Sequence, residues 1–161
     1  MKSKNKLLLA LFIVGLITVA GCASQKTGGN SQISGKVTDG VTATIFKSSS
    51  CGCCGVYSQY MEKRGFNVQV VDTEDLSATK NKYNIPRQME SCHTTVIGDY
   101  FVEGHVPVEA IQKLLEEKPD IAGIALPGMP SGSPGMPGAK YGPFVVYAIH
   151  KDGSINEFMK I

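Results

Sequence analysis

The sequence predicts a mixed α/β domain, in which a sheet of parallel and antiparallel strands is flanked by helices. Short runs of β-branched and aromatic residues alternate with segments whose apolar residues recur at helical spacing. The first three elements follow the order strand, helix, strand, which favours a parallel pair joined by a right-handed crossover. Two later apolar runs around Gly98-Asp99 indicate a hairpin, which adds antiparallel strands to the sheet.

The first half of the predicted domain reads strand, helix, strand, helix. Residues 41–46, VTATIF, are short and β-branched, as a strand should be. After three cysteines, large side chains recur at helical spacing over residues 57–64, and Gly65 suits the position after a helix end. Residues 66–72, FNVQVVD, predict the second strand. The helical pattern that follows stops at Pro86.

The second half adds a hairpin, a helix, a loop and a closing hairpin. Residues 94–104, TTVIGDYFVEG, form the predicted hairpin, and Pro107 suits the first turn of the helix after it. Residues 126–143 contain PGMP twice and have too much Gly and Pro for a helix or a central strand, so they predict a long ordered Gly/Pro/Met-rich loop. Residues 144–149 and 154–160 indicate a C-terminal β-hairpin. The order of elements before the loop is that of thioredoxin-like folds.

The N-terminal segment predicts a lipoprotein signal peptide over residues 1–21. Three lysines precede an apolar run over residues 7–20, which is shorter than the ~20 residues of a spanning helix. The ending VAGC is typical of a bacterial lipobox, so Cys22 is predicted to carry a lipid; the alternative is an ordinary signal peptide followed by a stray cysteine. Residues 22–36 predict a flexible tether, and residues 37–161 the folded domain. The expected location is extracytoplasmic, with the lipid anchored in a bacterial membrane.

Charge and motif content exclude several classes of function. The formal net charge is +2, and it becomes −1 once the three lysines of the signal peptide leave. No basic cluster remains, so nucleic acid is not an expected partner. The sequence also lacks a Ser/His/Asp order, a phosphate-binding loop and a pair of carboxylates, and it therefore gives no support to hydrolase or nucleotide-dependent functions.

Thiols carry the predicted chemistry. Cys51, Cys53 and Cys54 stand in the motif CGCC directly before the first helix, and Cys92 and His93 stand in SCH before the third strand. A thioredoxin-like sheet brings these two places together. A helix N-terminus stabilises thiolates, and thiolates with imidazole favour Cu(I) or Zn(II), while nearby methionines favour copper. The sequence therefore predicts a copper site made of these five residues, with enough soft ligands for more than one ion.

Two other interpretations remain open at this stage. Cys51 and Cys54 form a CxxC pair that suits a thiol–disulfide oxidoreductase, although Cys53 adds a third thiol that would resolve mixed disulfides. The four cysteines would also satisfy a structural zinc ion. Three further residues are weaker ligand candidates, because each has a simpler structural explanation: His105, Met129 and Met136.

Three segments carry a resemblance to a known family. They are CGCCGVYSQYMEKRGFNV, NIPRQMESCHTTVIGDYFVEGHVPVEAIQKLLEEKP and GIALPGMPSGSPGMP, and they resemble the bacterial metal-binding family catalogued as domain of unknown function 411, which includes copper-resistance proteins. The resemblance runs from about residue 41 to residue 158.

The resemblance implies a thioredoxin-like fold, an extracytoplasmic location and a role in copper resistance. It also implies interconversion of Cu(I) and Cu(II), so a copper oxidoreductase activity is one expectation. The expected partners are copper ions and other extracytoplasmic copper-handling proteins. By position, CGCC supplies Cys51, Cys53 and Cys54 as ligands, and SCH supplies Cys92 and His93. The chain departs from the family at Tyr57, where the family often has tryptophan.

Overall fold

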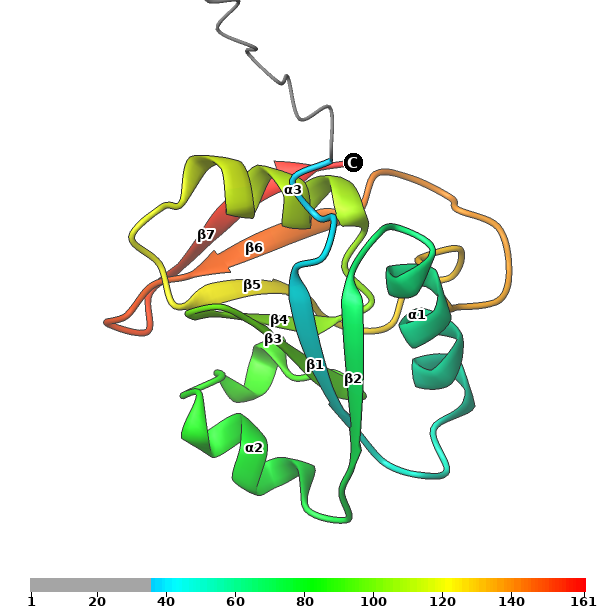
Figure 1. The fold of residues 1–161 in the computed structure, drawn as a ribbon. Coiled ribbons are helices and arrows are strands. Elements are labelled where there is room, and N and C mark those ends of the chain that lie inside the picture. The colour runs from blue at the N-terminus through cyan, green and yellow to red at the C-terminus, as the bar shows by residue number, and fades with distance from the viewer. Residues whose placement is uncertain (1–35) are drawn as a thin grey trace, which may run out of the picture. The chain divides into compact units, whose positions relative to one another are not determined.

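The computed structural model describes residues 36–161, which form a seven-stranded sheet flanked by helices (Figure 1). The predicted signal peptide, the lipidated Cys22 and the tether up to residue 35 lie outside the described residues. The elements are β1 (Thr42–Lys47), α1 (Gly52–Glu62), β2 (Asn67–Asp72), α2 (Leu76–Lys82), the 3-10 turn η1 (Arg87–Met89), β3 (His93–Ile97), β4 (Tyr100–Gly104), α3 (Val108–Glu117), β5 (Gly123–Leu126), β6 (Val145–Ile149) and β7 (Ile155–Lys160). Among these residues, none of the helices has the length and apolar character needed to cross a membrane.

The strand order across the sheet is β2-β1-β3-β4-β5-β6-β7. β1 runs parallel to β2 and β4 runs parallel to β5, whereas the other neighbouring pairs are antiparallel. Helices α1 and α3 provide the two connections between parallel strands, as such connections require. The predicted fold class, a thioredoxin-like mixed sheet with flanking helices and a closing hairpin, is confirmed.

The three helices begin and end where local chemistry permits. The side chain of Asp75 accepts a hydrogen bond from the backbone N–H of Ala78 at 2.9 Å and so caps the start of α2. Pro107 stands directly before α3, where its missing N–H costs no helical hydrogen bond. The first helix ends at Glu62, earlier than predicted, and Gly65 turns the chain toward β2 with a φ of 97°.

The central strands bury side chains on both faces of the sheet. Val102 and Ile124 pack in one apolar cluster with residues of α1 and α3. Their neighbours Phe101 and Ala125 pack in a second cluster with residues that follow α2. Because successive residues of a strand point to opposite faces, α1 and α3 cover one side of the sheet and α2 covers the other. The cysteines before and within α1 therefore belong to the α1 side.

The sequence did not indicate β5, and it placed the start of the long loop one residue too early, at Leu126. This strand has four residues, all of them buried, so it has neither the length nor the alternation by which an isolated strand is recognised. It begins with Gly123, at which an added Cβ would lie 2.3 Å from the backbone oxygen of Phe101. β5 therefore depends on a glycine that propensity alone would count against a strand.

We expect Gly123→Ala to lower the free energy of unfolding by about 1–3 kcal/mol, because the new methyl group overpacks the contact with Phe101. Urea denaturation followed by circular dichroism measures this change. Gly142→Ala is the matched control, since a Cβ there has no neighbour within 4 Å. An equal loss of stability in both variants would contradict the assigned contact.

Candidate metal centre

The four predicted cysteines come together where α1 and β3 begin. Cys51 immediately precedes α1, and Cys53 and Cys54 lie in its first turn. Cys92 immediately precedes β3. The sulfur atoms of these four residues, hereafter the cysteine cluster, all lie within 4.8 Å of one another. Such proximity allows them to bind one metal ion or to exchange disulfides.

Two of these cysteines are joined in the structure. Cys51 and Cys54 form a disulfide with a Cα–Cα distance of 5.4 Å, and Cys53 and Cys92 are free thiols. The free sulfur of Cys53 lies 3.6 Å from that of Cys51. The pair that suggested a thiol oxidoreductase is therefore oxidised here. All four sulfurs become available to a metal only after this disulfide is reduced.

Two histidines complete a second set of ligand atoms around Cys92. His93 is the first residue of β3, and its Nδ1 lies 3.4 Å from the sulfur of Cys92. His105 follows β4, and its Nε2 lies 3.1 Å from the same sulfur. The two imidazole rings are nearly perpendicular, with centroids 4.8 Å apart. Cys92 thus belongs both to the cysteine cluster and to this Cys-His-His set.

The hydrogen bonds of His105 favour a role as a ligand. Nδ1 of His105 lies 2.6 Å from the carbonyl oxygen of Pro134, which only accepts, so Nδ1 carries the proton and Nε2 presents its lone pair toward Cys92. Metal-binding histidines commonly have such a second contact. Nε2 of His93 is buried and has no hydrogen-bond partner among residues 36–161. The sequence ranked His105 below His93, although its place at a strand end next to Cys92 was the available signal.

Tyr57 fills the space behind both histidines. Its ring centroid lies 4.5 Å from that of His93 and 5.5 Å from that of His105. The side chain is fully buried, and its hydroxyl donates a hydrogen bond to the carbonyl oxygen of Val106 at 3.0 Å. Tyrosine therefore supplies the aromatic packing for which the resembled family often uses tryptophan, and it closes this side of the site to water.

Burial keeps the site neutral when no metal is bound. Burial, together with the smaller effects of His105 and Lys80, lowers the pKa of His93 to about 3. Burial also lowers the pKa of His105, so both imidazoles are neutral near pH 7, which is the form that binds metals. Burial, followed by the charge of Cys53, raises the pKa of the Cys92 thiol to about 11. A metal ion must therefore displace a proton from Cys92.

Residues 127–143, hereafter the cover loop, pass beside α1 (Figure 1). A Cβ at Gly135 would lie 2.9 Å from both the Cys53 oxygen and the Tyr57 nitrogen, so only glycine fits this contact. A hollow of about 470 Å³ at the contact is lined by Cys53, Val56, Gly135, Met136 and Pro137. Met136 therefore lies near a free thiol. Met129 is 41% exposed and is not among the residues that line this hollow.

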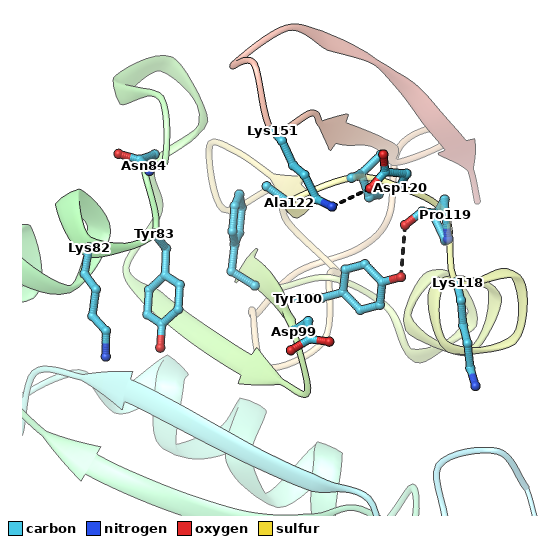
Figure 2. A pocket seen from close by; sticks show the side chains of 12 residues that line it. Lys82, Tyr83, Asn84, Asp99, Tyr100, Lys118, Pro119, Asp120, Ala122 and Lys151 are labelled. Carbon is cyan, nitrogen blue, oxygen red and sulfur yellow. Dashed lines mark hydrogen bonds and ion pairs between the residues drawn. The ribbon is translucent and has the colours of Figure 1, made fainter.

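A second hollow, of about 440 Å³, has the wrong chemistry for soft metals (Figure 2). Lys151 pairs with Asp120 there, and the hydroxyl of Tyr100 donates a hydrogen bond to the carbonyl oxygen of Pro119 at 3.0 Å. The lining residues described for this hollow include neither cysteine nor histidine. The candidate metal centre is therefore the cysteine cluster with its two histidines.

We expect Gly135→Ala to displace the cover loop and to raise the alkylation rate of the Cys53 thiol several-fold, because the new methyl group cannot fit against α1. Timed iodoacetamide labelling with peptide mass spectrometry measures this rate. Gly128→Ala is the matched control: its φ of 80° is close to the 84° of Gly135, but a Cβ there has no neighbour within 4 Å. Equal acceleration in both variants would attribute the effect to backbone strain and reject the contact.

Comparisons with known proteins identify relatives of this chain. The profile of the family described as "Protein of unknown function, DUF411" matches residues 89–136, which include Cys92, both histidines and Met136. A search of curated protein sequences finds no match.

Two solved structures resemble the chain closely. They are titled "Copper resistance protein copG- Form 1" and "Copper resistance protein copG- Form 2", and each is 37% identical in sequence with a TM-score of 0.71. Each alignment covers 76% of this chain, and it covers 98% of the first structure and 99% of the second. Identity at this level over nearly the whole of a solved chain means that the protein belongs to the DUF411 family of CopG-type copper resistance proteins.

Proposed function

We propose that the protein captures Cu(I) in copper resistance, with the cysteine cluster as thiolate ligands and His93 completing the site. The observation that carries this proposal is the convergence of four sulfur atoms within 4.8 Å of one another. Thiolates and imidazoles select Cu(I) or Zn(II) over harder ions. The two similar structures are titled as copper resistance proteins, which supports copper as the ion.

Capture requires that the disulfide is first reduced and that the thiols then give up their protons to make room for copper. Reduction of the Cys51–Cys54 disulfide takes two electrons and two protons and yields two thiols, for which a cellular thiol is a suitable reductant. Each thiol then releases its proton as its sulfur binds copper. The neutral imidazoles need no such change. Because Cys92 belongs to two overlapping ligand sets, we propose that the site could hold a second copper ion, for which Cys92 and His105 would be ligands.

The proposed setting is the outer side of a bacterial membrane. The predicted lipid on Cys22 and the tether over residues 22–36 would hold the domain there. Copper ions are the proposed cargo, and other extracytoplasmic copper-handling proteins are the proposed donors or acceptors. A free Cys53 beside the hollow of the cover loop supports exchange at this point, because a partly exposed thiol gives an incoming metal ion its first ligand.

We expect Cys53→Ser to weaken Cu(I) binding by more than about 100-fold, the upper end of what loss of a supporting residue costs a metal site. Anaerobic titration of the reduced protein against a Cu(I) chelator measures this affinity. Val56→Ser is the matched control, because it places the same polar side chain in the same hollow and removes no ligand.

Measurements of thiol oxidoreductase activity, metal preference and stability separate the alternatives. A thiol–disulfide oxidoreductase would retain activity in Cys53→Ser and lose it in Cys51→Ser, while Cu(I) affinity would be weak throughout. A structural zinc domain would prefer zinc to copper and unfold when a chelator removes the metal. Either pattern would replace the copper proposal.

Interconversion of Cu(I) and Cu(II) is a second candidate function, and the Cys51–Cys54 disulfide favours it. A disulfide accepts two electrons, so it can oxidise two Cu(I) ions: the sulfur–sulfur bond breaks, two Cu(II) ions form, and two protons convert the two thiolates to thiols. The reverse reaction would return Cu(I) and the disulfide. The disulfide would then accept electrons in one direction, and the two thiols would donate them in the other.

We expect anaerobic addition of two equivalents of Cu(I) to the disulfide form to produce a Cu(II) signal in electron paramagnetic resonance. Alkylation after copper removal should then find four thiols in place of two, because the disulfide has been reduced. The Cys51→Ser/Cys54→Ser variant, which lacks the acceptor, is the control and should stay silent. Absence of the signal from the disulfide form would restrict the protein to capture.

A further inference from the structure

We propose that Glu103 and Lys80 are positioning residues that hold Cys92 and His93 in place from the opposite face of the sheet. The inference rests on the proposed function, because it concerns the presentation of the same ligands. Lys80 lies in α2 and Glu103 lies in β4, and both side chains are buried in an ion pair. A buried ion pair contributes little to stability, because removal of its charges from water costs about as much free energy as their attraction returns. The presence of this pair therefore calls for another explanation.

The carboxylate of Glu103 binds the chain on both sides of the two ligands. Its Oε1 accepts a hydrogen bond from the backbone N–H of Ser91 at 2.5 Å and also pairs with the ammonium of Lys80. Its Oε2 accepts a hydrogen bond from the hydroxyl of Thr94 at 2.6 Å. One side chain therefore fixes residues 91 and 94, and the ligands at 92 and 93 lie between these two contacts.

The pleat of β3 separates this support from the metal centre. Thr94 pairs with Glu103 in the β3–β4 register, so both side chains lie on the α2 face. His93 lies on the other face, where its ring packs against Tyr57. Glu103 can therefore hold the backbone without contacting the metal or its ligand atoms.

The support also extends to His105. A Cβ at Gly104 would lie 2.7 Å from the hydroxyl oxygen of Ser91, so the segment before β3 packs directly on the end of β4. Gly104 lies between Glu103 and His105. Displacement of Ser91 would consequently disturb the spacing between Cys92 and Nε2 of His105, which is 3.1 Å.

Three donors converge on Glu103, and this explains why a carboxyl group rather than an amide stands there. A carboxylate accepts at both oxygens, whereas a glutamine would direct an NH₂ group toward one of the donors. Lys80 also donates a hydrogen bond to the hydroxyl oxygen of Thr94 at 3.3 Å. Lys80 therefore contacts both members of the Glu103–Thr94 pair and helps to fix the orientation of the Glu103 side chain.

We expect Glu103→Gln to weaken Cu(I) binding of the reduced protein about 10- to 100-fold, the range seen when residues that orient metal ligands are replaced. We also expect it to change the alkylation rate of Cys92 relative to that of Cys53 in the metal-free protein, because only Cys92 is held by this contact. Leu114→Ala is the matched control: Leu114 is fully buried in α3 on the other face, so the variant loses stability through a cavity and keeps the contact.

The alkylation ratio needs no copper, so it tests the positioning even if the wild-type protein fails to bind Cu(I), an outcome that would overturn only the proposed function. A Glu103→Gln protein with the wild-type ratio and affinity would overturn the inference. So would equal changes in Glu103→Gln and Leu114→Ala, because the effect would then follow stability alone. If Glu103→Gln does not fold, Thr94→Val takes its place as the test. This variant removes one of the hydrogen bonds to Glu103 and keeps the ion pair. It should change the Cys92 to Cys53 alkylation ratio relative to the wild-type protein, by a smaller factor than loss of the carboxylate would, and an unchanged ratio would overturn the inference.

Discussion

The pairing of β3 with both β1 and β4 is the interaction on which the metal centre depends. Lys47 at the end of β1 pairs with His93 at the start of β3, so the chain that leaves β1 toward Cys51 sets out beside Cys92. Thr94 pairs with Glu103 on the other side, so β4 ends near Cys92, and His105, which follows β4, lies there. A slip of one residue in β3 would exchange its two faces and send His93 away from the cysteines. The register of one five-residue strand thus assembles ligands from three separate parts of the chain.

Burial gives this centre its chemical character. A metal-free site with two neutral imidazoles and a protonated Cys92 carries little charge, which a largely buried position can tolerate. Because the pKa of Cys92 is raised, binding of a metal ion by its sulfur is coupled to release of its proton. The disulfide of Cys51 and Cys54 is another neutral arrangement of the same sulfurs. Dithiol, disulfide and metal-bound forms are therefore alternative ways of satisfying one crowded group of atoms.

Local signals predicted the elements that carry the ligands, and long-range contacts decided the rest. The motif CGCC before a helical pattern and SCH before a strand were sufficient to bring the cysteines together, because the fold class fixes where these elements meet. The sequence could not give the redox state of Cys51 and Cys54, since spacing alone suits a disulfide and a metal equally. The sequence also did not predict the proposed roles of Lys80 and Glu103. Both residues would ordinarily be solvated on a helix or strand, and their pairing spans 23 positions of the chain.

The cover loop shows how tertiary contacts give different roles to identical sequences. The motif PGMP occurs twice, at residues 127–130 and 134–137. The second copy supplies the carbonyl oxygen that fixes the tautomer of His105, the glycine that packs on α1 and the methionine beside Cys53. The first copy has an exposed methionine and a glycine without close neighbours. Because the proton on Nδ1 of His105 is held by this backbone contact, the position of the cover loop decides which nitrogen of His105 is free to act as the proposed ligand.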